Sequence, residues 1–324
     1  MTYTVREEDF NGITAYWMRQ EYRLSFPSIF VTPPYLESWW QVFGESRLYL
    51  ASIWQDSTLL GIAPLQIHGE TISLIGSPDV CDYLDFITVE GNEEEFFSAL
   101  LDNLKRKGIS ELDINPVRGD SRIMSSLLQE ARQHGYLVNQ EQEDLSLEMA
   151  LPQTWEDYLK MLDGKSRHEL RRKFRRLETA DSISYQIAQD ESAINTVLPE
   201  FLRLFSTSKG KKAAFMTEKM SRFFHTLTHN LARFNLMRFG SLKLADKTIS
   251  MVMCFDYHDT IYLYNSAYEP AYNHLSPGIL AKALYIRDSI EKGEKILNFL
   301  KGSETYKYQL GGSEVPIYHL KISL

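Results

Sequence analysis

Two stretches of the chain, residues 53–74 and 242–263, repeat one pattern of strands and turns. Each holds three apolar-rich segments joined by two short polar turns, QDST and HGET in the first stretch and ADKT and YHDT in the second. This spacing predicts an antiparallel meander in each copy. In both copies a predicted helix follows, and then a short apolar strand, LDIN at 112–115 and ILNF at 296–299. Few residues are identical, so chance similarity of two meanders is the alternative to a tandem α/β repeat.

The length of the chain supports two domains. Its 324 residues exceed the usual length of a domain with a single hydrophobic core, and its hydrophobic content of 44% is sufficient for large buried cores. We therefore expect an α/β fold with mixed sheets, divided into a domain over residues 1–150 and a second domain over 151–324. The second domain is predicted to begin with a basic helical pair at 154–179.

Local signals mark where several helices begin and end. Predicted helices at 93–107, 120–134 and 276–292 each end at a glycine that suits a left-handed C-cap. Thr154 with Asp157, and Ser166 with Glu169, have the spacing of capping boxes. Gly164 is expected to end the first helix of the basic pair, and Ser166 to start the second.

Composition excludes several classes of protein. The net charge of -8 argues against an extended nucleic-acid footprint, and two distant cysteines, Cys81 and Cys254, favour buried thiols in a reducing compartment. No apolar run reaches the length of a membrane span, and the first residues lack a signal-peptide core, so we expect a cytoplasmic protein. The pair His225 and His229 lacks the glutamate and third ligand of a zinc site, so no metal is expected.

Several segments resemble a known family in order along the chain. A meander, a helix and a parallel strand is the core order of the GNAT fold, and two tandem copies resemble the Fem-type ligases and the CelD-like acetyltransferases of bacterial polysaccharide loci. The matching segments are LLGIAPLQI (59–67), DYLDF (82–86), the block 155–178, YLYNSAYEPAYNHLSPG (262–278) and NFLKGSETYK (298–307). The resemblance implies two GNAT domains, each a mostly antiparallel mixed sheet flanked by helices, and acyl transfer to an amine.

A donor site is predicted where the last long helix begins. Ser276, Pro277 and Gly278 suit the N-cap and first turn of a helix, whose free N–H groups can bind the pyrophosphate of coenzyme A, and Lys282 adds a charge one turn later. The alternative is that these residues merely start the helix. The glycine-rich phosphate loop usual in GNAT domains, Q/R-x-x-G-x-G/A, is absent. The equivalent helix of the first copy begins with three glutamates, at 93–95, which would repel a phosphate, so the first domain is expected to be degenerate for donor binding.

The resemblance also suggests catalytic residues near the C-terminus. In Fem-type ligases a Tyr/Phe-Lys pair lies beside the reacting carbonyl, and Tyr306-Lys307 stands in the similar position here. By that analogy Lys307 stabilises the oxyanion, and Glu304 orients the lysine or the amine. A solvated loop with a surface lysine is the alternative.

An aspartate of the first domain is the candidate base. Asp82 and Asp85 lie in the apolar setting of CDYLDF, where burial would raise a carboxyl pKa towards the range of a general base. Fem-type ligases similarly have an aspartate from the first domain in the cleft. We prefer Asp85, and a structural role in a turn or an ion pair is the alternative.

The segment 165–176, KSRHELRRKFRR, gathers seven basic residues in an acidic protein. Helical spacing aligns Arg167, Arg171 and Arg175 on one stripe, while Leu170, Phe174 and Leu177 form an apolar stripe towards the core. Arginine favours bidentate contacts with phosphate or carboxylate. The stripe is therefore either an anion-binding surface or simply a solvated face of the helix.

These expectations combine into one functional hypothesis. The chain is expected to be an N-acyltransferase that moves an acyl group from acyl-CoA (acetyl-CoA) directly to an amine of a cell-envelope or polysaccharide precursor, such as an amino sugar. One alternative is an aminoacyl-tRNA-dependent ligase of the Fem type, which the missing phosphate loop favours and the short helical pair disfavours. Another is a non-catalytic binding module of the same fold.

Overall fold

The chain forms two compact units, and the boundaries between them fall within the strands β8 and β14. The computed structural model describes residues 3–180, 182–207 and 215–324. Unit 1 comprises residues 1–145 and 315–324, and unit 2 comprises 146–314. The sequence-based ranges assigned the last ten residues to the second domain, whereas their contacts place them in unit 1.

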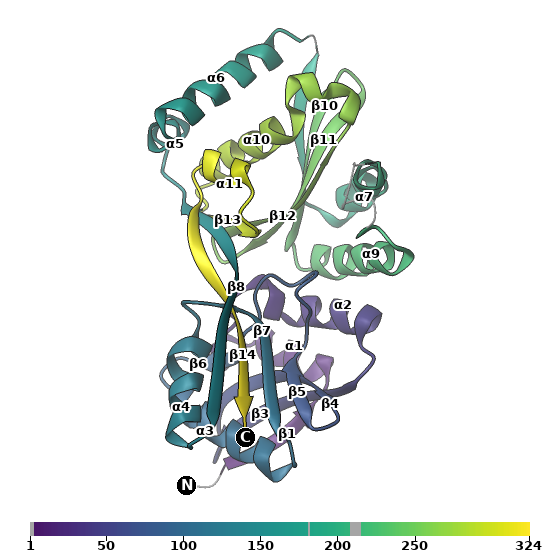
Figure 1. The fold of residues 1–324 in the computed structure, drawn as a ribbon. Helices are drawn as coiled ribbons and strands as arrows, with labels where there is room; N and C mark the ends of the chain where they lie inside the picture. Colours follow the sequence, from purple (N-terminus) through teal and green to yellow (C-terminus); the bar gives the residue numbers. More distant parts are fainter. Residues whose placement is uncertain (1–2, 181, 208–214) are drawn as a thin grey trace. The chain divides into compact units, whose positions relative to one another are not determined.

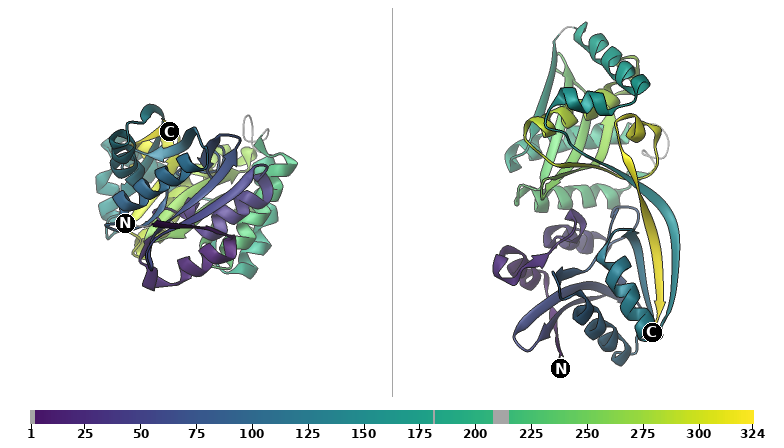
Figure 2. Two further views of the ribbon diagram at one scale, coloured as in Figure 1. Left: turned by 90° about the horizontal axis from the view of Figure 1, so that it is seen from below. Right: turned by 90° about the vertical axis from the view of Figure 1, so that its left-hand side faces the viewer.

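Unit 1 is an α/β layer built around the first meander (Figure 1). Its strands follow the order β1-β3-β4-β5-β7-β14, with β5 and β7 parallel and β14 antiparallel to β7. The helices α3 and α4 cover one face of the sheet, and α1 and α2 cover the other (Figure 2). Its elements are β1 (Tyr3–Glu8), α1 (Phe10–Met18), β2 (Leu24–Ser25), α2 (Pro33–Phe43), β3 (Arg47–Gln55), β4 (Thr58–His68), β5 (Thr71–Leu74), β6 (Ile87–Val89), α3 (Glu93–Arg106), β7 (Glu111–Arg118), η3 (Ile123–Leu127), α4 (Leu128–Gln133), the first part of β8 (Leu137–Ala150) and β14 (Ser313–Ser323).

Unit 2 repeats this arrangement around the second meander. Its strands follow the order β8-β13-β12-β11-β10-β9, with β12 and β13 parallel. The helices α5, α6 and α10 lie on one face, and α7 and α9 on the other (Figures 1 and 2). Its elements are α5 (Trp155–Met161), α6 (Gly164–Glu178), β9 (Ile183–Ala188), α7 (Glu191–Ser206), α9 (Glu218–Ala232), β10 (Met237–Leu244), β11 (Lys247–Tyr257), β12 (Thr260–Tyr268), η4 (Pro270–Leu275), α10 (Pro277–Glu291), β13 (Ile296–Lys301) and α11 (Thr305–Gln309).

The structure confirms the predicted tandem repeat. Each copy has three antiparallel strands, then a helix, then a strand parallel to the third one. The three glycines expected to stop helices, Gly108, Gly135 and Gly293, all have a left-handed φ of 77° to 80°. The two copies differ in the third strand, since β5 has four residues and β12 has nine. This difference shapes the candidate site.

The basic helix α6 begins earlier than predicted. Its N-cap is Asp163, whose side chain accepts hydrogen bonds from the N–H groups of Lys165 (2.9 Å) and Ser166 (3.0 Å). Gly164 is therefore the first residue of α6, and Ser166 lies inside the helix. Because Asp163 already accepts from the free N–H groups of the first turn, Ser166 has no capping role. The other predicted cap is confirmed, because Thr154 accepts a hydrogen bond from the N–H of Asp157.

The apolar stripe of α6 faces the core of unit 2, as predicted. Leu170 and Leu177 are buried, and Phe174 packs partly buried against the same cluster. Both cysteines are buried free thiols. Among the residues that the structure describes, no helix combines the length and apolarity needed to cross a membrane.

A histidine joins β14 to both neighbouring strands in unit 1. The imidazole Nε2 of His319 lies 2.7 Å from Oδ1 of Asp113 on β7, and Nδ1 lies 2.9 Å from Oε1 of Glu143 on β8. Lys321 adds a charge 3.4 Å from Asp113. Burial alone would lower the pKa of His319, but the hydrogen bonds to the two carboxylates outweigh it and raise the pKa above its ordinary value.

We expect this histidine to make the stability of unit 1 depend on pH. Because its folded-state pKa is raised, its stabilising contribution is complete below about 6.5, the ordinary pKa of histidine, and is lost as the pH rises through the folded-state value. Urea unfolding should therefore show a larger difference between the native chain and His319→Gln at about pH 6 than at about pH 9. Replacing the exposed His68 by glutamine is the control. An equal difference at both values would contradict the prediction.

Candidate active site

In unit 2 the parallel pairing of β12 with β13 covers only the first part of β12. They pair only at Thr260 with Ile296, Ile261 with Leu297 and Tyr262 with Asn298. The remaining residues of β12, up to Tyr268, extend past this pairing. In unit 1, β5 pairs with β7 over three of its four residues. An edge of backbone amides and carbonyls suited to an extended ligand is therefore a feature of the second copy.

The helix α10 begins directly after this strand edge and η4. Pro277 and Gly278 occupy its first turn, as predicted. Ser276 stands at the N-cap position in a left-handed conformation (φ 56°), and its side chain makes no capping hydrogen bond within the described residues. The carbonyl of Ser276 instead accepts from the N–H groups of Ile279 and Leu280, both at 3.2 Å. Pro277 has no N–H group and that of Ile279 already donates, so Gly278 supplies the available N–H of the first turn, and the helix start keeps its partial positive charge.

Gly278 lies against the ring of Tyr268. A Cβ atom at this position would stand 3.1 Å from Cδ1 of Tyr268, which is 40% exposed. The missing side chain therefore lets a ligand approach the helix backbone beside an exposed aromatic ring. Tyr268 belongs to the tyrosine-rich segment 262–278, one of the segments that match the family. In the same segment, Tyr262 is buried, and the ring of Tyr264 lies 4.5 Å from that of Phe255 at a tilt of 35°.

Lys282 brings the two predicted motifs of unit 2 together. It is 5% exposed, its ammonium group donates to the carbonyl of Gly278 (3.1 Å), and it lies 4.7 Å from the centre of the Tyr306 ring. The start of α10 and the Tyr306-Lys307 pair, separated in sequence, are thus adjacent in space. Burial raises the pKa of the Tyr306 hydroxyl, so this residue stays neutral.

Lys307 has a different environment from the one expected of an oxyanion donor. It is 2% exposed, and its Nζ atom donates to the carbonyls of Leu300 (2.9 Å), Lys301 (2.6 Å) and Gly302 (3.0 Å). The carboxylate of Glu304 lies 2.9 Å away. An ammonium group has three donors, and all of them are engaged here. In this structure Lys307 and Glu304 brace a turn.

Asn298 supports the same turn from the other side, which the sequence did not indicate. Its Oδ1 atom accepts from the N–H of Leu300 (2.8 Å), and its Nδ2 atom donates to Glu148 on β8 (2.9 Å). Leu300 has a left-handed φ of 64°, rare for a residue with a branched side chain. The buried Asn within an apolar strand was the available signal, since such a residue needs a partner.

Asp85 lies in unit 1, whereas the other predicted site residues lie in unit 2. It is 6% exposed, and its carboxylate accepts a hydrogen bond from the N–H of Phe86 (2.8 Å). Burial raises the pKa of Asp85 to about 7, against the opposing effects of that hydrogen bond and of Arg122. Asp82 is only half-buried. The predicted preference for Asp85 therefore coincides with the more buried carboxyl group.

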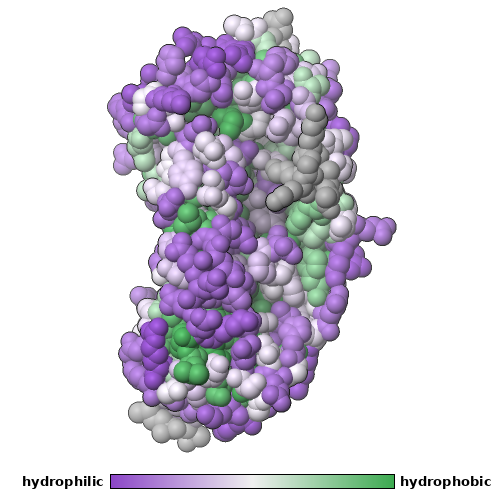
Figure 3. Space-filling model, in the orientation of Figure 1, coloured by the Kyte–Doolittle hydropathy of each residue, from purple (hydrophilic) through white to green (hydrophobic). Residues whose placement is uncertain are grey.

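The basic residues of α6 divide between different partners. Arg172 and Lys173 bind Glu169, which lowers the pKa of Glu169 to about 2. Arg176 donates to the carbonyl of His274 in η4 (2.7 Å), which links α6 to the segment before α10. Figure 3 shows a largely hydrophilic surface over α5 and α6.

Two hollows lie on either side of α6. The first, which we call the α10 pocket, has a volume of about 240 Å³. It is lined from α6 by Lys165, Glu169 and Lys173, and it also includes Ile279 of α10 and Gln309 of α11. The second, which we call the arginine groove, has a volume of about 580 Å³ and is lined by Trp155, His168, Arg171, Phe174, Arg175 and Arg287 together with Glu156, Leu159 and Glu178. Of the three arginines predicted to form a stripe, Arg171 and Arg175 line the arginine groove, and Arg167 lines neither of these two hollows.

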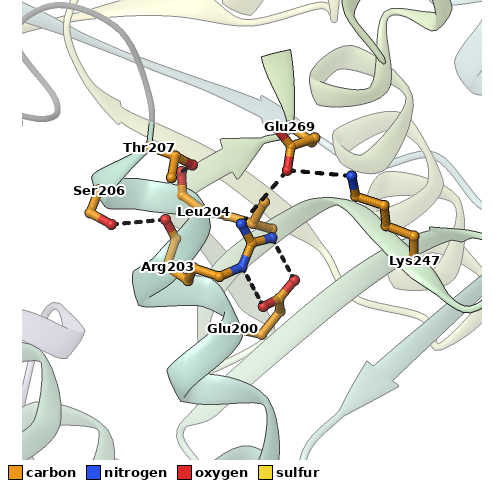
Figure 4. A network of polar contacts seen from close by, with 7 residues as sticks. All are labelled: Glu200, Arg203, Leu204, Ser206, Thr207, Lys247 and Glu269. Atoms are coloured by element: carbon orange, nitrogen blue, oxygen red, sulfur yellow. Dashed lines mark hydrogen bonds and ion pairs between the residues drawn. The ribbon is translucent and has the colours of Figure 1, made fainter. Parts of the chain in front are cut away.

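A charged network anchors the segment that precedes α10 (Figure 4). Arg203 of α7 binds Glu200 through two hydrogen bonds of 2.7 and 2.8 Å, and it lies 3.7 Å from Glu269 at the end of β12. Lys247 lies 3.9 Å from the same carboxylate and 5.1 Å from the ring centre of Tyr272 in η4. Glu269 thus ties the start of η4 to α7 and β11.

The comparisons with known proteins agree with this fold. Residues 164–308 match the family described as an acetyltransferase (GNAT) domain. No curated protein matches the sequence. The GNAT match runs from the start of α6 into α11, and so it includes the start of α10 and Lys307 and most of the residues that line the two hollows.

Solved structures show the same architecture over almost the whole chain at low identity. A crystal structure of FemX has a TM-score of 0.64 and 11% identity, covering 98% of this chain and 96% of that one. The structure of L-PGS from Bacillus licheniformis has a TM-score of 0.55 and 12% identity, with coverages of 88% and 90%. A tandem GNAT protein from the clavulanic acid biosynthesis pathway has a TM-score of 0.51 and 9% identity, with 98% of each chain covered. The chain therefore consists of two GNAT-like domains.

Proposed function

We propose that this chain is an N-acyltransferase whose second unit binds an acyl-CoA donor. The observation that carries the proposal is the position of the α10 N-terminus, soon after the part of β12 that extends past its pairing with β13 and beside the α10 pocket. Amides of an extended donor can pair with the strand edge, and its phosphates can meet the positive start of α10 at the N–H of Gly278. The pocket holds part of such a ligand, since complete small-molecule sites measure roughly 300 to 1,000 Å³.

Unit 1 supports the assignment of the donor to unit 2. The first turn of α3 carries Glu93, whose carboxylate accepts from the N–H of Gly91 (2.8 Å) and lies 3.3 Å from Arg122. This helix N-terminus is neutralised by its own side chains. The short strand β5 leaves no comparable edge.

In the proposed reaction the amine of the acceptor attacks the thioester carbonyl of the donor. A carbon–nitrogen bond forms, the carbon–sulfur bond breaks, and coenzyme A leaves as the thiol. The amine loses a proton to Asp85 or to water, and the raised pKa of Asp85 suits it to accept that proton near neutral pH. Lys307 acts on this step by holding the turn at residues 300–302, which precedes Tyr306. The acceptor we propose is an amine of a cell-envelope or polysaccharide precursor.

The second candidate is a ligase that takes an aminoacyl-tRNA as donor. The missing glycine-rich loop and the structural similarity to FemX favour it. A thermal-shift screen with acetyl-CoA, longer acyl-CoAs and charged tRNA separates the two candidates. We expect acyl-CoA to stabilise the chain by about 2.7 kcal/mol at a hundredfold excess over its Kd. A shift with charged tRNA and none with any CoA would reject the leading proposal.

Filling the space at Gly278 should weaken donor binding selectively. In Gly278→Val the new side chain meets the Tyr268 ring and covers the first turn of α10. We expect the Kd for acetyl-CoA, measured by calorimetry, to rise by about tenfold or more. Gly164→Ala is the matched control, because Gly164 also occupies a first helical turn and a Cβ there has open space. If both variants bound acetyl-CoA as the native chain does, α10 would not be the donor site.

A further inference from the structure

The arginine groove is a separate site from the α10 pocket. The residues of α6 that line the pocket (165, 166, 169, 170 and 173) and those that line the groove (168, 171, 174, 175 and 178) alternate along the helix. At about 100° per residue the two sets point to opposite sides of the helix axis. The body of α6 therefore stands between the two hollows. The donor proposed for the α10 pocket therefore does not by itself account for the arginine groove.

The guanidinium groups of the groove are loosely engaged. Arg171 lies 3.8 Å from Glu156, and Arg287 of α10 lies 4.0 Å from Glu291. Arg175 has no ion pair within the described part of the chain. Arg172 on the same helix differs, because two hydrogen bonds of 3.1 and 2.5 Å hold it to Glu169. Three arginines are thus available to an anion in the groove.

The groove combines these arginines with aromatic surface. The rings of Trp155 and Phe174 line it, both are half-buried, and they meet edge to face with their centres 5.8 Å apart. His168 lies on the same side, and the carboxylates of Glu156 and Glu178 are outnumbered by the cationic groups. An inorganic anion alone would leave the aromatic surface uncovered. A ligand with both a flat ring and a phosphate would use both features.

We propose that the arginine groove binds a nucleotide, with its phosphates on Arg171, Arg175 and Arg287 and its base on the Trp155 and Phe174 rings. The volume of about 580 Å³ suits a ligand of this size. The groove draws on two helices, α5 and α6, and on the second half of α10, all within unit 2. The nucleotide is either free or part of a larger ligand such as coenzyme A. The inference does not depend on the acyltransferase activity.

Calorimetry with the full chain tests the proposal, using ADP, inorganic pyrophosphate and adenosine as probes. ADP should bind more tightly than either fragment, and the double variant R171A/R175A should weaken ADP binding by about tenfold or more. Arg172→Ala is the control, because it removes one positive charge from the same helix outside the groove. It should leave ADP binding unchanged. ADP binding that is absent, or weakened equally by R172A, would overturn the proposal.

Two further probes identify the source of the nucleotide. If R171A/R175A weakens the binding of acetyl-CoA as much as the binding of ADP, the groove binds the nucleotide part of the donor. If the binding of acetyl-CoA is unaffected, the groove binds a separate nucleotide. A short single-stranded RNA is the other probe. RNA binding much tighter than ADP and steeply dependent on salt would overturn the proposal in favour of a nucleic-acid surface. Gly278→Val leaves the groove intact. If this variant loses acetyl-CoA binding while R171A/R175A does not, the result concerns the proposed function and not the groove.

Discussion

Replacing Lys307 by methionine is expected to lower the free energy of unfolding of unit 2 by about 3 kcal/mol. The methionine fills a similar volume but supplies no donor. The carbonyls of Leu300, Lys301 and Gly302 would then lose the ammonium group that they share at 2.6 to 3.0 Å. The Glu304 side chain is 58% exposed and can return to water, so most of the loss comes from the carbonyls.

Urea unfolding of the native chain and of Lys307→Met measures this loss. Lys295→Ala is the control, because this lysine is exposed near the start of β13 and should change stability by less than about 0.5 kcal/mol. The same pair of variants decides between two roles for Lys307. Unchanged stability combined with a large fall in kcat would show that Lys307 acts directly on the reacting carbonyl, and would contradict the bracing role.

Replacing Asp85 by asparagine is expected to stabilise unit 1 at alkaline pH. The folded-state pKa of about 7 lies above the ordinary value of 3.8, so folding favours the neutral carboxyl group. Its contribution to stability is complete below the unfolded-state pKa and is lost as the pH rises through about 7. Asparagine stays neutral and can still accept from the N–H of Phe86. The variant should gain up to roughly 4 kcal/mol over the native chain above about pH 8.

If Asp85 is the base, the Asp85→Asn variant should lose activity although it gains stability. This combination is expected where a catalytic group is held in an unfavourable environment. Unfolding and turnover measured on the same samples test both parts. Asp79→Asn, at an exposed position in the same region, should change neither. A stabilised variant with full activity would leave Asp85 without a catalytic role.

Local signals in the sequence predicted the framework of both units. The meanders, the helix-stopping glycines and the buried stripe of Leu170 and Leu177 depend on periodicity and on backbone conformation. These properties are set by residues a few positions apart, so they can be inferred without knowing the tertiary contacts. The start of α6 was misplaced because Asp163 and Ser166 are both good N-caps and lie three residues apart.

Long-range packing decided what the candidate site residues do. The sequence by itself determined that unit 2 contains a helix start free of carboxylates, a Tyr306-Lys307 pair and a helix rich in arginine. Only the tertiary structure engaged the Lys307 ammonium with three carbonyls, placed Lys282 on the Tyr306 ring, and divided the α6 side chains between two hollows. It also placed residues 315–324, which include most of β14, in unit 1. The physical reason is that a charged side chain takes its role from burial and from partners distant in sequence, and neither is encoded in local spacing.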